Sequence, residues 1–323
     1  MNKKLVAIDC GKAETKVYAY DTTTGKITSA IISSRVSHSN PLVKVALNGA
    51  NVVTFPNPDP ETEGEWIVGA LDGAPSNSNS KKDHIHKILT LTAIALVTEN
   101  GDSVTASIGC PLSVFSNDAE KHEYYDYIFP DGRVNITLDG QQRYFYIEKD
   151  KCMVFPESFG ALFLYEDMFT NRTGVVDIGG LNVNASYFLN KKLAPFYCMT
   201  EKLGYYSLVA YLRARLNAKC DAGFDDATVD FFIRQGYVTN MKDTAKDIEE
   251  AKELHVQRIG QVISQWDLTS SNLVFIGGTA ELLKKYIEKQ YGKRAFIPEE
   301  ANLINCRGFL RAMLMCYGYN AQV

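Results

Sequence analysis

The chain has 323 residues, of which 46% are hydrophobic and 22% are charged. These proportions are ordinary for a globular protein, and the length is ample for a large core and suggests two domains. With 34 basic against 38 acidic side chains the formal net charge is −4, which argues against direct, phosphate-driven binding of nucleic acid as the main activity.

The seven cysteines are scattered and include no C-x-x-C pair. Neither a zinc site nor a disulfide framework is expected, and a reducing cytoplasm fits this pattern. No apolar run reaches the roughly 18 residues of a membrane span. Residues 1–4 lead straight into a predicted strand, so neither a signal peptide nor a membrane partner is expected.

The first predicted element is an apolar strand that ends in Asp-x-Gly at residues 9–11. A second strand follows directly, and a third covers residues 27–32 after a turn. Residues 33–80 carry a hairpin signal at Asn48-Gly49 and several prolines, which predicts a small β-rich insertion outside the core.

A helix is predicted over residues 82–99. Its histidines, His84 and His86, are two apart and do not share a helix face, so they are interpreted as solvated. A strand over 104–108 and a hairpin over 134–147 follow.

A further strand stops at Pro156, where the pattern predicts the start of a helix that runs to about Phe169. Glu157 then falls in the first turn of that helix. A carboxylate in this position complements the helix dipole even without any function.

The middle of the chain repeats the opening pattern. An apolar strand reaches Asp177 just before a glycine pair at 179–180, a period-two strand covers 183–189, and a third strand is expected over 193–197.

The remaining chain is predicted to be mostly helical over residues 201–269. A strand over 272–276 then ends at a second glycine pair, 277–278, and a helix begins at about Glu281. A glycine pair between a strand and a helix start suits a nucleotide lying against the backbone. A C-terminal helix is predicted over 302–315.

The repeated unit places an acid and glycines at a strand–strand turn. Glycine lets a ligand approach the backbone, amides can cradle phosphate, and a carboxylate can hold a hydrated Mg²⁺. One such turn is common and is often only structural. Because the unit occurs twice, at Asp9 and at Asp177, we expect two like domains that face one ligand.

Five short elements now stand in one order, and together they resemble the phosphate 1, connect 1, phosphate 2, adenosine and connect 2 signatures of the actin, sugar kinase and heat-shock ATPase superfamily. They are Ile8–Gly11, Phe155–Ser158, Val176–Gly180, Phe275–Thr279 and Asn305–Gly308.

Within that superfamily the chain looks most like bacterial actin-like plasmid-segregation proteins of the ParM type. The features that point there are the compact length and the segments Gly109–Leu112, Pro156–Ser158 and Arg307–Phe309.

The resemblance implies an α/β, actin-like fold, that is, a duplicated ribonuclease H-like fold with a nucleotide cleft between two domains. Domain I would comprise residues 1–165 and 305–323, with the insertion at about 33–80. Domain II would comprise residues 166–304, with the helical insertion at about 201–269.

The resemblance also implies residue roles. Asp9 and Asp177 would hold Mg²⁺, mostly through water, and Glu157 would position or polarise the attacking water. The implied nucleotide-binding residues are Gly11, Lys12, Gly179, Gly180 and Leu181 around the phosphates, and Gly277, Gly278, Thr279, Glu201 and Lys202 around base and ribose. Lys12-Ala13 replaces the usual hydroxyl residue of phosphate 1, so Lys12 would supply charge instead.

The function implied is a filament-forming protein that hydrolyses ATP or GTP with Mg²⁺ and drives plasmid DNA segregation. Its partners would be further copies of itself and a DNA-binding adaptor, with filament contacts involving residues 33–80 and 201–269. Two alternatives stay open: a small-molecule kinase of the same fold, and a non-polymerising scaffold or adaptor. No base for a kinase pocket is evident, and the tail after Met315 is not an amphipathic membrane helix.

Overall fold

The structure is a computed structural model, and it describes residues 2–39, 49–56, 62–69, 74–75, 81–130 and 132–323. By its internal contacts the chain divides into two compact units. Unit 1 comprises Met1–Leu164 and Asn305–Val323, and unit 2 comprises Tyr165–Ile304.

Unit 1 is built on a mixed sheet that has eleven strands among the described residues, in the order β3-β2-β1-β8-β10-β9-β5-β6-β4-β7 with β11 beside β8. The strands are β1 (Lys3–Cys10), β2 (Glu14–Asp21), β3 (Ile27–Ser33), β4 (Arg35–His38), β5 (Asn51–Thr54), β6 (Glu65–Val68), β7 (Ala74–Pro75), β8 (Asp102–Cys110), β9 (Gly132–Leu138), β10 (Gln141–Ile147) and β11 (Met153–Pro156). The helices are α1 (His84–Val97), α2 (Leu112–Phe115), α3 (Asp118–Ile128), α4 (Gly160–Leu164) and α9 (Ile304–Cys316).

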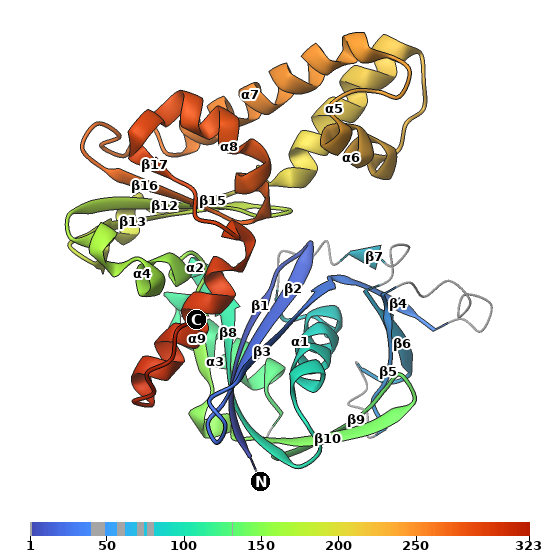
Figure 1. Ribbon diagram of the computed structural model, residues 1–323, viewed down its shortest axis with the longest axis vertical. Helices are drawn as coiled ribbons and strands as arrows, with labels where there is room; N and C mark the ends of the chain where they lie inside the picture. Colours follow the sequence, from blue (N-terminus) through green and yellow to red (C-terminus); the bar gives the residue numbers. More distant parts are fainter. Residues whose placement is uncertain (1, 40–48, 57–61, 70–73, 76–80, 131) are drawn as a thin grey trace. The chain divides into compact units, whose positions relative to one another are not determined.

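Strand β1 is buried on both faces. Because side chains alternate along a strand, Val6 and Ile8 pack into the cluster around α1, whereas Leu5 and Ala7 pack against α9. The sheet curves around α1, with β1–β3 on one side of the helix and β4–β6 on the other (Figure 1).

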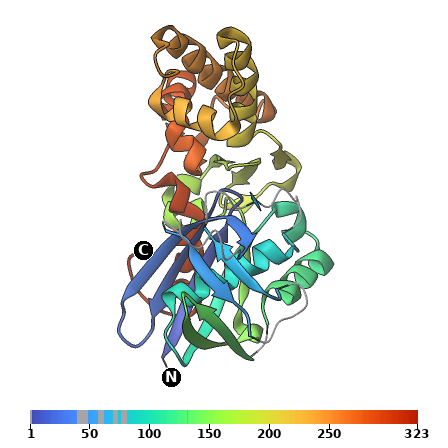
Figure 2. The same ribbon diagram turned by 90° about the vertical axis from the view of Figure 1, so that its right-hand side faces the viewer.

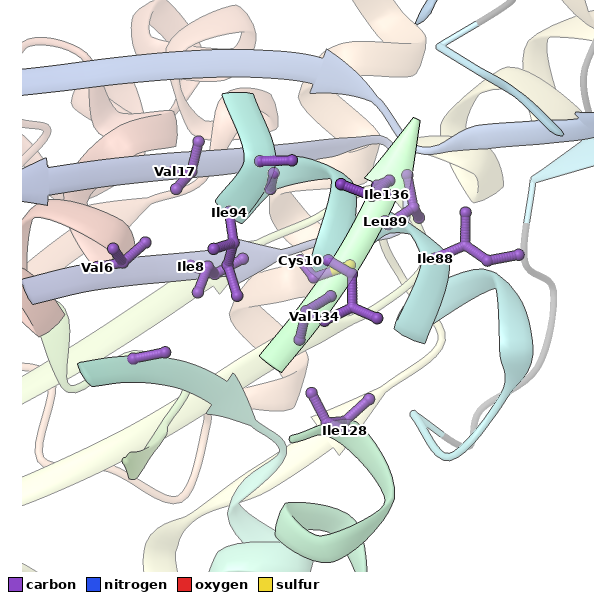
Figure 3. Close-up of a cluster of buried hydrophobic side chains, with 14 of the residues drawn as sticks. Val6, Ile8, Cys10, Val17, Ile88, Leu89, Ile94, Ile128, Val134 and Ile136 are labelled. Atoms are coloured by element: carbon purple, nitrogen blue, oxygen red, sulfur yellow. The ribbon is translucent and has the colours of Figure 1, made fainter. Parts of the chain in front are cut away.

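Figure 3 shows the inside of this curve. The side chains of β1 meet those of α1, α3 and β9 there. The residues labelled are Val6, Ile8, Cys10, Val17, Ile88, Leu89, Ile94, Ile128, Val134 and Ile136.

The described parts of residues 33–80 do not form the insertion outside the core that their sequence suggested. Strand β5 pairs with β9 through Val53 and Leu138, and so β5, β6 and β4 continue the main sheet. Val53 and Trp66 are buried in the same cluster as β1. Pairing with a strand far away in sequence brings these three strands into the core. Asn48 of the expected hairpin lies outside the described residues.

His86 is also not solvated. It is 3% exposed, and its Nε2 lies 2.8 Å from the hydroxyl oxygen of Tyr124, which donates to the carbonyl of Gly109. Helix α1 is enclosed by the sheet and α3 at this level, so the face that carries His86 does not meet water. His84, two residues earlier and on another face of α1, is exposed.

Unit 2 carries a second mixed sheet in the order β14-β13-β12-β16-β17, with β15 beside β13. Its strands are β12 (Arg172–Ile178), β13 (Val183–Leu189), β14 (Lys192–Leu193), β15 (Met199–Glu201), β16 (Asn272–Ile276) and β17 (Ala295–Phe296). Its helices are α5 (Tyr205–Cys220), α6 (Asp226–Gln235), α7 (Ala245–Val262) and α8 (Gly278–Tyr291). Their buried side chains join those of one face of the sheet in a single hydrophobic cluster.

The predicted helical region over 201–269 is confirmed by α5, α6 and α7, which stand together in Figure 2. The predicted third strand over 193–197 is wrong beyond Leu193. Residues Pro195–Tyr197 form a short 3₁₀ helix, because Pro195 has no N–H to donate to a neighbouring strand.

The repeat seen in the sequence is a repeat in structure. In unit 1, β1 pairs antiparallel with β2 and parallel with β8. In unit 2, β12 pairs antiparallel with β13 and parallel with β16. In each unit, therefore, the second-last residue of a central strand is an aspartate next to a hairpin turn.

Candidate functional site

In unit 1 the candidate site begins with Asp9 at the end of β1. The residue is 7% exposed, and it faces Lys16 across the hairpin, with 4.0 Å between Lys16 Nζ and Asp9 Oδ2. Burial raises the pKa of Asp9, and the positive charges of Lys16 and Lys81 oppose that rise. Sequence reasoning missed Lys16, although pairing the two strands of the hairpin across their turn places it opposite Asp9.

Gly11 closes the turn between β1 and β2. Its N–H donates to the carbonyl of Glu14 at 3.1 Å, and an added Cβ would come within 2.9 Å of the same oxygen. The side chain of Lys12 turns toward Asp83, with 3.9 Å between Nζ and Oδ2. Burial lowers the pKa of Lys12, and Asp83 opposes that change. A phosphate would have to share the Gly11 amide with Glu14, while Lys12 and Lys16 bring positive charge to the turn.

Glu157 does not lie in the first turn of a helix as its sequence suggested. It lies in the turn after β11, and α4 begins only at Gly160. The reason is Ser158, whose φ of 73° is left-handed and whose N–H donates to Asn305 Oδ1 at 3.0 Å. The N–H of Glu157 donates to the carbonyl of Cys110 at 2.8 Å, which fixes this turn to the end of β8.

The carboxylate of Glu157 forms an ion pair and hydrogen bond with Lys81, whose Nζ also donates to the carbonyl of Cys10 at 3.3 Å. Lys81 is 8% exposed. The sequence offers the pair Lys81-Lys82 ahead of a helix capped by Asp83, but nothing in it says which lysine is buried. Asp9, Glu157, Lys16 and Lys81 together form what we call the acid–lysine cluster.

In unit 2 the candidate site is built around Asp177, near the end of β12. The residue is 8% exposed, and β16 runs alongside with Ile276 in register. Gly277 follows, with φ 89°, and an added Cβ there would lie 2.7 Å from Asp177 Oδ1. The glycine therefore allows β16 to turn into α8 directly beside the carboxylate. Helix α8 begins at Gly278, three residues earlier than its sequence suggested.

The glycine pair after β12 is joined to the start of α5. The carbonyl of Gly179 accepts the N–H of Tyr205 at 3.0 Å, and the carbonyl of Gly180 accepts that of Tyr206 at 2.9 Å. Thr279 Oγ1 donates to the same Gly179 carbonyl at 3.3 Å. The N–H of Gly179 itself donates to the backbone carbonyl of Asn182, within the turn, at 2.9 Å.

Gly204 belongs to the same group of residues in unit 2, and sequence reasoning missed it. Its N–H donates to the carbonyl of Leu181 at 3.0 Å, and a Cβ there would lie 2.6 Å from the carbonyl oxygen of Gly180. Any side chain at position 204 would clash with this carbonyl group, so only glycine fits there. Glu201 pairs with Val183 at the end of β15, and Lys202 follows it, both with exposed side chains in the segment that leads to Gly204.

The predicted residues thus form one group in each unit. Asp9, Gly11, Lys12 and Glu157 lie in unit 1. The unit 2 set is Asp177, Gly179, Gly180, Leu181, Glu201, Lys202, Gly277, Gly278 and Thr279. Within the described ranges, no group of three or more His, Cys, Asp or Glu side chains could hold a metal ion. Carboxylate oxygens do suit Mg²⁺, which is commonly bound by one or two of them together with water and substrate phosphates.

Comparisons with known proteins show which fold the chain shares. Residues 7–160 match the family model described as the actin like proteins N terminal domain. A 15-stranded ParM filament from Clostridium botulinum superposes with a TM-score of 0.75 at 18% identity, over 97% of this chain and 99% of that one. No curated protein matches the sequence.

Two other solved structures superpose over nearly the whole chain. An Alp12 filament structure gives a TM-score of 0.66 at 24% identity, covering 98% of this chain and all of that one. An archaeal actin homolog gives 0.73 at 15% identity, covering 96% of this chain and 99% of that one.

The chain therefore has the actin-like fold, and this confirms the predicted fold class. The predicted likeness to bacterial actin-like proteins of the ParM type is confirmed at the level of the fold. In the part of the chain that the structure describes, no helix combines the length and the apolar character needed to cross a membrane.

Proposed function

We propose that this chain is a nucleotide-dependent, filament-forming protein of the ParM type that hydrolyses ATP or GTP with Mg²⁺. The observation that supports this most directly is the duplication of the hairpin. Each copy holds a buried aspartate, Asp9 or Asp177, at the end of a central strand beside a glycine turn, and the whole chain has an actin-like fold.

In this proposal Asp9 and Asp177 hold Mg²⁺, mostly through water. The bound ion supplies charge neutralisation at the phosphate oxygens, which phosphoryl transfer to water requires. Lys12 and Lys16 add positive charge at the first hairpin. The amides of residues 11–12 and 179–181 approach the phosphates, and Gly277, Gly278, Thr279, Glu201 and Lys202 line base and ribose.

Glu157 orients and polarises the attacking water. Its position supports this role because its backbone is held by Cys110 and its carboxylate is held by Lys81. A carboxylate that acts on water contributes mainly in the transition state, so its loss should lower turnover far more than nucleotide binding.

We further propose that the nucleotide state controls assembly into filaments that move plasmid DNA in the cytoplasm, linked to it by a DNA-binding adaptor. Filament growth needs a heterologous contact that does not close. Unit 2 offers exposed apolar surface in its helical region, where Phe231 on α6 is 55% exposed. The net charge of −4 supports an adaptor rather than direct binding of DNA.

Sedimentation and phosphate release, measured together on the full chain, test the proposal. We expect pelleting and phosphate release with Mg-ATP or Mg-GTP, and neither with nucleotide in excess EDTA. Phosphate transfer only when a small-molecule acceptor is added would favour the kinase. Neither assembly nor turnover with either nucleotide at micromolar protein would favour the scaffold.

A further inference from the structure

Lys81 is a buried lysine whose ammonium joins two parts of the candidate site in unit 1. Its Nζ donates to the carbonyl of Cys10, the last residue of β1, at 3.3 Å. It also donates to Oε1 of Glu157, in the turn after β11. One ammonium therefore ties the phosphate hairpin to the turn that carries the proposed water-orienting acid.

The ammonium also balances two buried acids. Burial by itself would lower the pKa of Lys81, but the negative charges of Glu157 and Asp9 together raise the pKa above its usual range, so the side chain stays charged. Without it, the carboxylates of Asp9 and Glu157, which repel one another, would lose a shared positive neighbour. A single lysine thus supports both acids that the proposed reaction uses.

A lysine ammonium has three N–H donors. Among the residues that the structure describes, the ammonium of Lys81 uses two of these donors, one to the carbonyl of Cys10 and one to the carboxylate of Glu157. The ammonium of Lys81 contacts one carboxylate oxygen of Glu157. The residue before Glu157 belongs to β11, and β11 pairs with β8. Backbone and side chain of Glu157 are therefore both held, one by Cys110 and the other by Lys81.

Building on the proposed function, we propose that Lys81 is the positioning residue of the hydrolytic site, holding the Glu157 carboxylate in place for the attacking water. It acts through Glu157 and not by binding the nucleotide. A misplacement of about 1 Å at a reacting group can lower the rate by ~100-fold. Loss of the ammonium should therefore lower kcat by about that factor and leave KM within about threefold.

Lys82 provides a matched control. It is the next residue, and it forms an exposed ion pair with Glu123 at 2.6 Å, away from the acid–lysine cluster. Lys81→Met removes the charge and keeps the length of the side chain, and Lys82→Met makes the same change outside the cluster. Lys81→Gln, which retains N–H donors, is the second variant should Lys81→Met not fold, as judged by circular dichroism.

The test is steady-state phosphate release by the full-length protein with Mg-ATP or Mg-GTP. The proposal expects a kcat loss of ~100-fold for Lys81→Met, a smaller loss for Lys81→Gln, and wild-type values for Lys82→Met. Since Lys81 acts through Glu157, the double variant with Glu157→Gln should be no slower than Glu157→Gln alone.

The proposal would be overturned if Lys81→Met and Lys82→Met had equal kcat, or if Lys81→Met raised KM and left kcat unchanged. It would also be overturned if Lys81→Met slowed the Glu157→Gln protein by the same factor by which it slows the wild-type protein. If the wild-type protein released no phosphate, Lys82→Met would be inactive as well, and this distinguishes a failure of the proposed hydrolysis from a failure of the role of Lys81 alone. That outcome would overturn the proposed hydrolysis itself and the role of Lys81 with it.

Discussion

Gly277 is the position where one added methyl group should most disturb the candidate site in unit 2. Its φ of 89° and ψ of 155° fall in a region open essentially to glycine alone, and any other residue there is destabilised by about 1–3 kcal/mol. A Cβ would also lie 2.5 Å from the carbonyl oxygen of Ile178 and 2.7 Å from Asp177 Oδ1. Overpacking of this kind adds about 1–3 kcal/mol.

We therefore expect Gly277→Ala to lower the free energy of unfolding by about 2–6 kcal/mol. Because the clash involves Asp177 itself, the relaxed variant should also displace this carboxylate and weaken Mg²⁺-dependent nucleotide binding. Urea unfolding followed by circular dichroism measures the first effect, and binding of a fluorescent nucleotide with and without Mg²⁺ measures the second.

Gly278→Ala is the matched control. A Cβ at Gly278 would first meet Asn302 Cβ at 3.7 Å, an ordinary contact, and the residue opens α8. Alanine favours a helix over glycine by up to about 1 kcal/mol, so this variant should be no less stable than the wild type. Equal stability of Gly277→Ala and wild type, or an equal loss in both variants, would refute the reasoning.

Three further outcomes follow from the proposed site. Asp177→Ala should abolish Mg²⁺-dependent nucleotide binding or turnover, and wild-type levels of both would contradict the metal assignment. Glu157→Ala should bind nucleotide almost normally, release little phosphate and form longer-lived assemblies; normal phosphate release would mean that another group orients the water. Light scattering should rise after ATP or GTP is added. A gel-shift assay at physiological salt should show no DNA binding by the chain alone, and tight sequence-specific binding in that assay would remove the need for an adaptor.

Much of the fold could be predicted because its signals are local. An apolar run, an aspartate and a glycine turn within about ten residues define each copy of the hairpin, and the repeat at Asp9 and Asp177 indicated a duplicated fold. The hairpin of β9 and β10 and the helical region of unit 2 were predictable for the same reason. Period two and helical spacing need no knowledge of the rest of the chain.

Other features depend on partners that are distant in sequence. Ser158 adopts a left-handed conformation with its N–H bonded to Asn305, 147 residues away, and this delays α4 and places Glu157 in a turn. The described strands within residues 33–80 enter the core because β5 pairs with β9. Local patterns carry no information about such pairings, since the same residues could equally form an exposed insertion.

Burial likewise divides neighbours that the sequence treats alike. Lys81 and Lys82 are identical and adjacent, yet Lys81 lies within the acid–lysine cluster and Lys82 pairs with Glu123 at the surface. His86 is enclosed and His84 is exposed. The sequence determines which charges and hydrogen-bonding groups are present. Only the tertiary structure decides which of them leave water, because desolvation depends on everything that packs around a side chain.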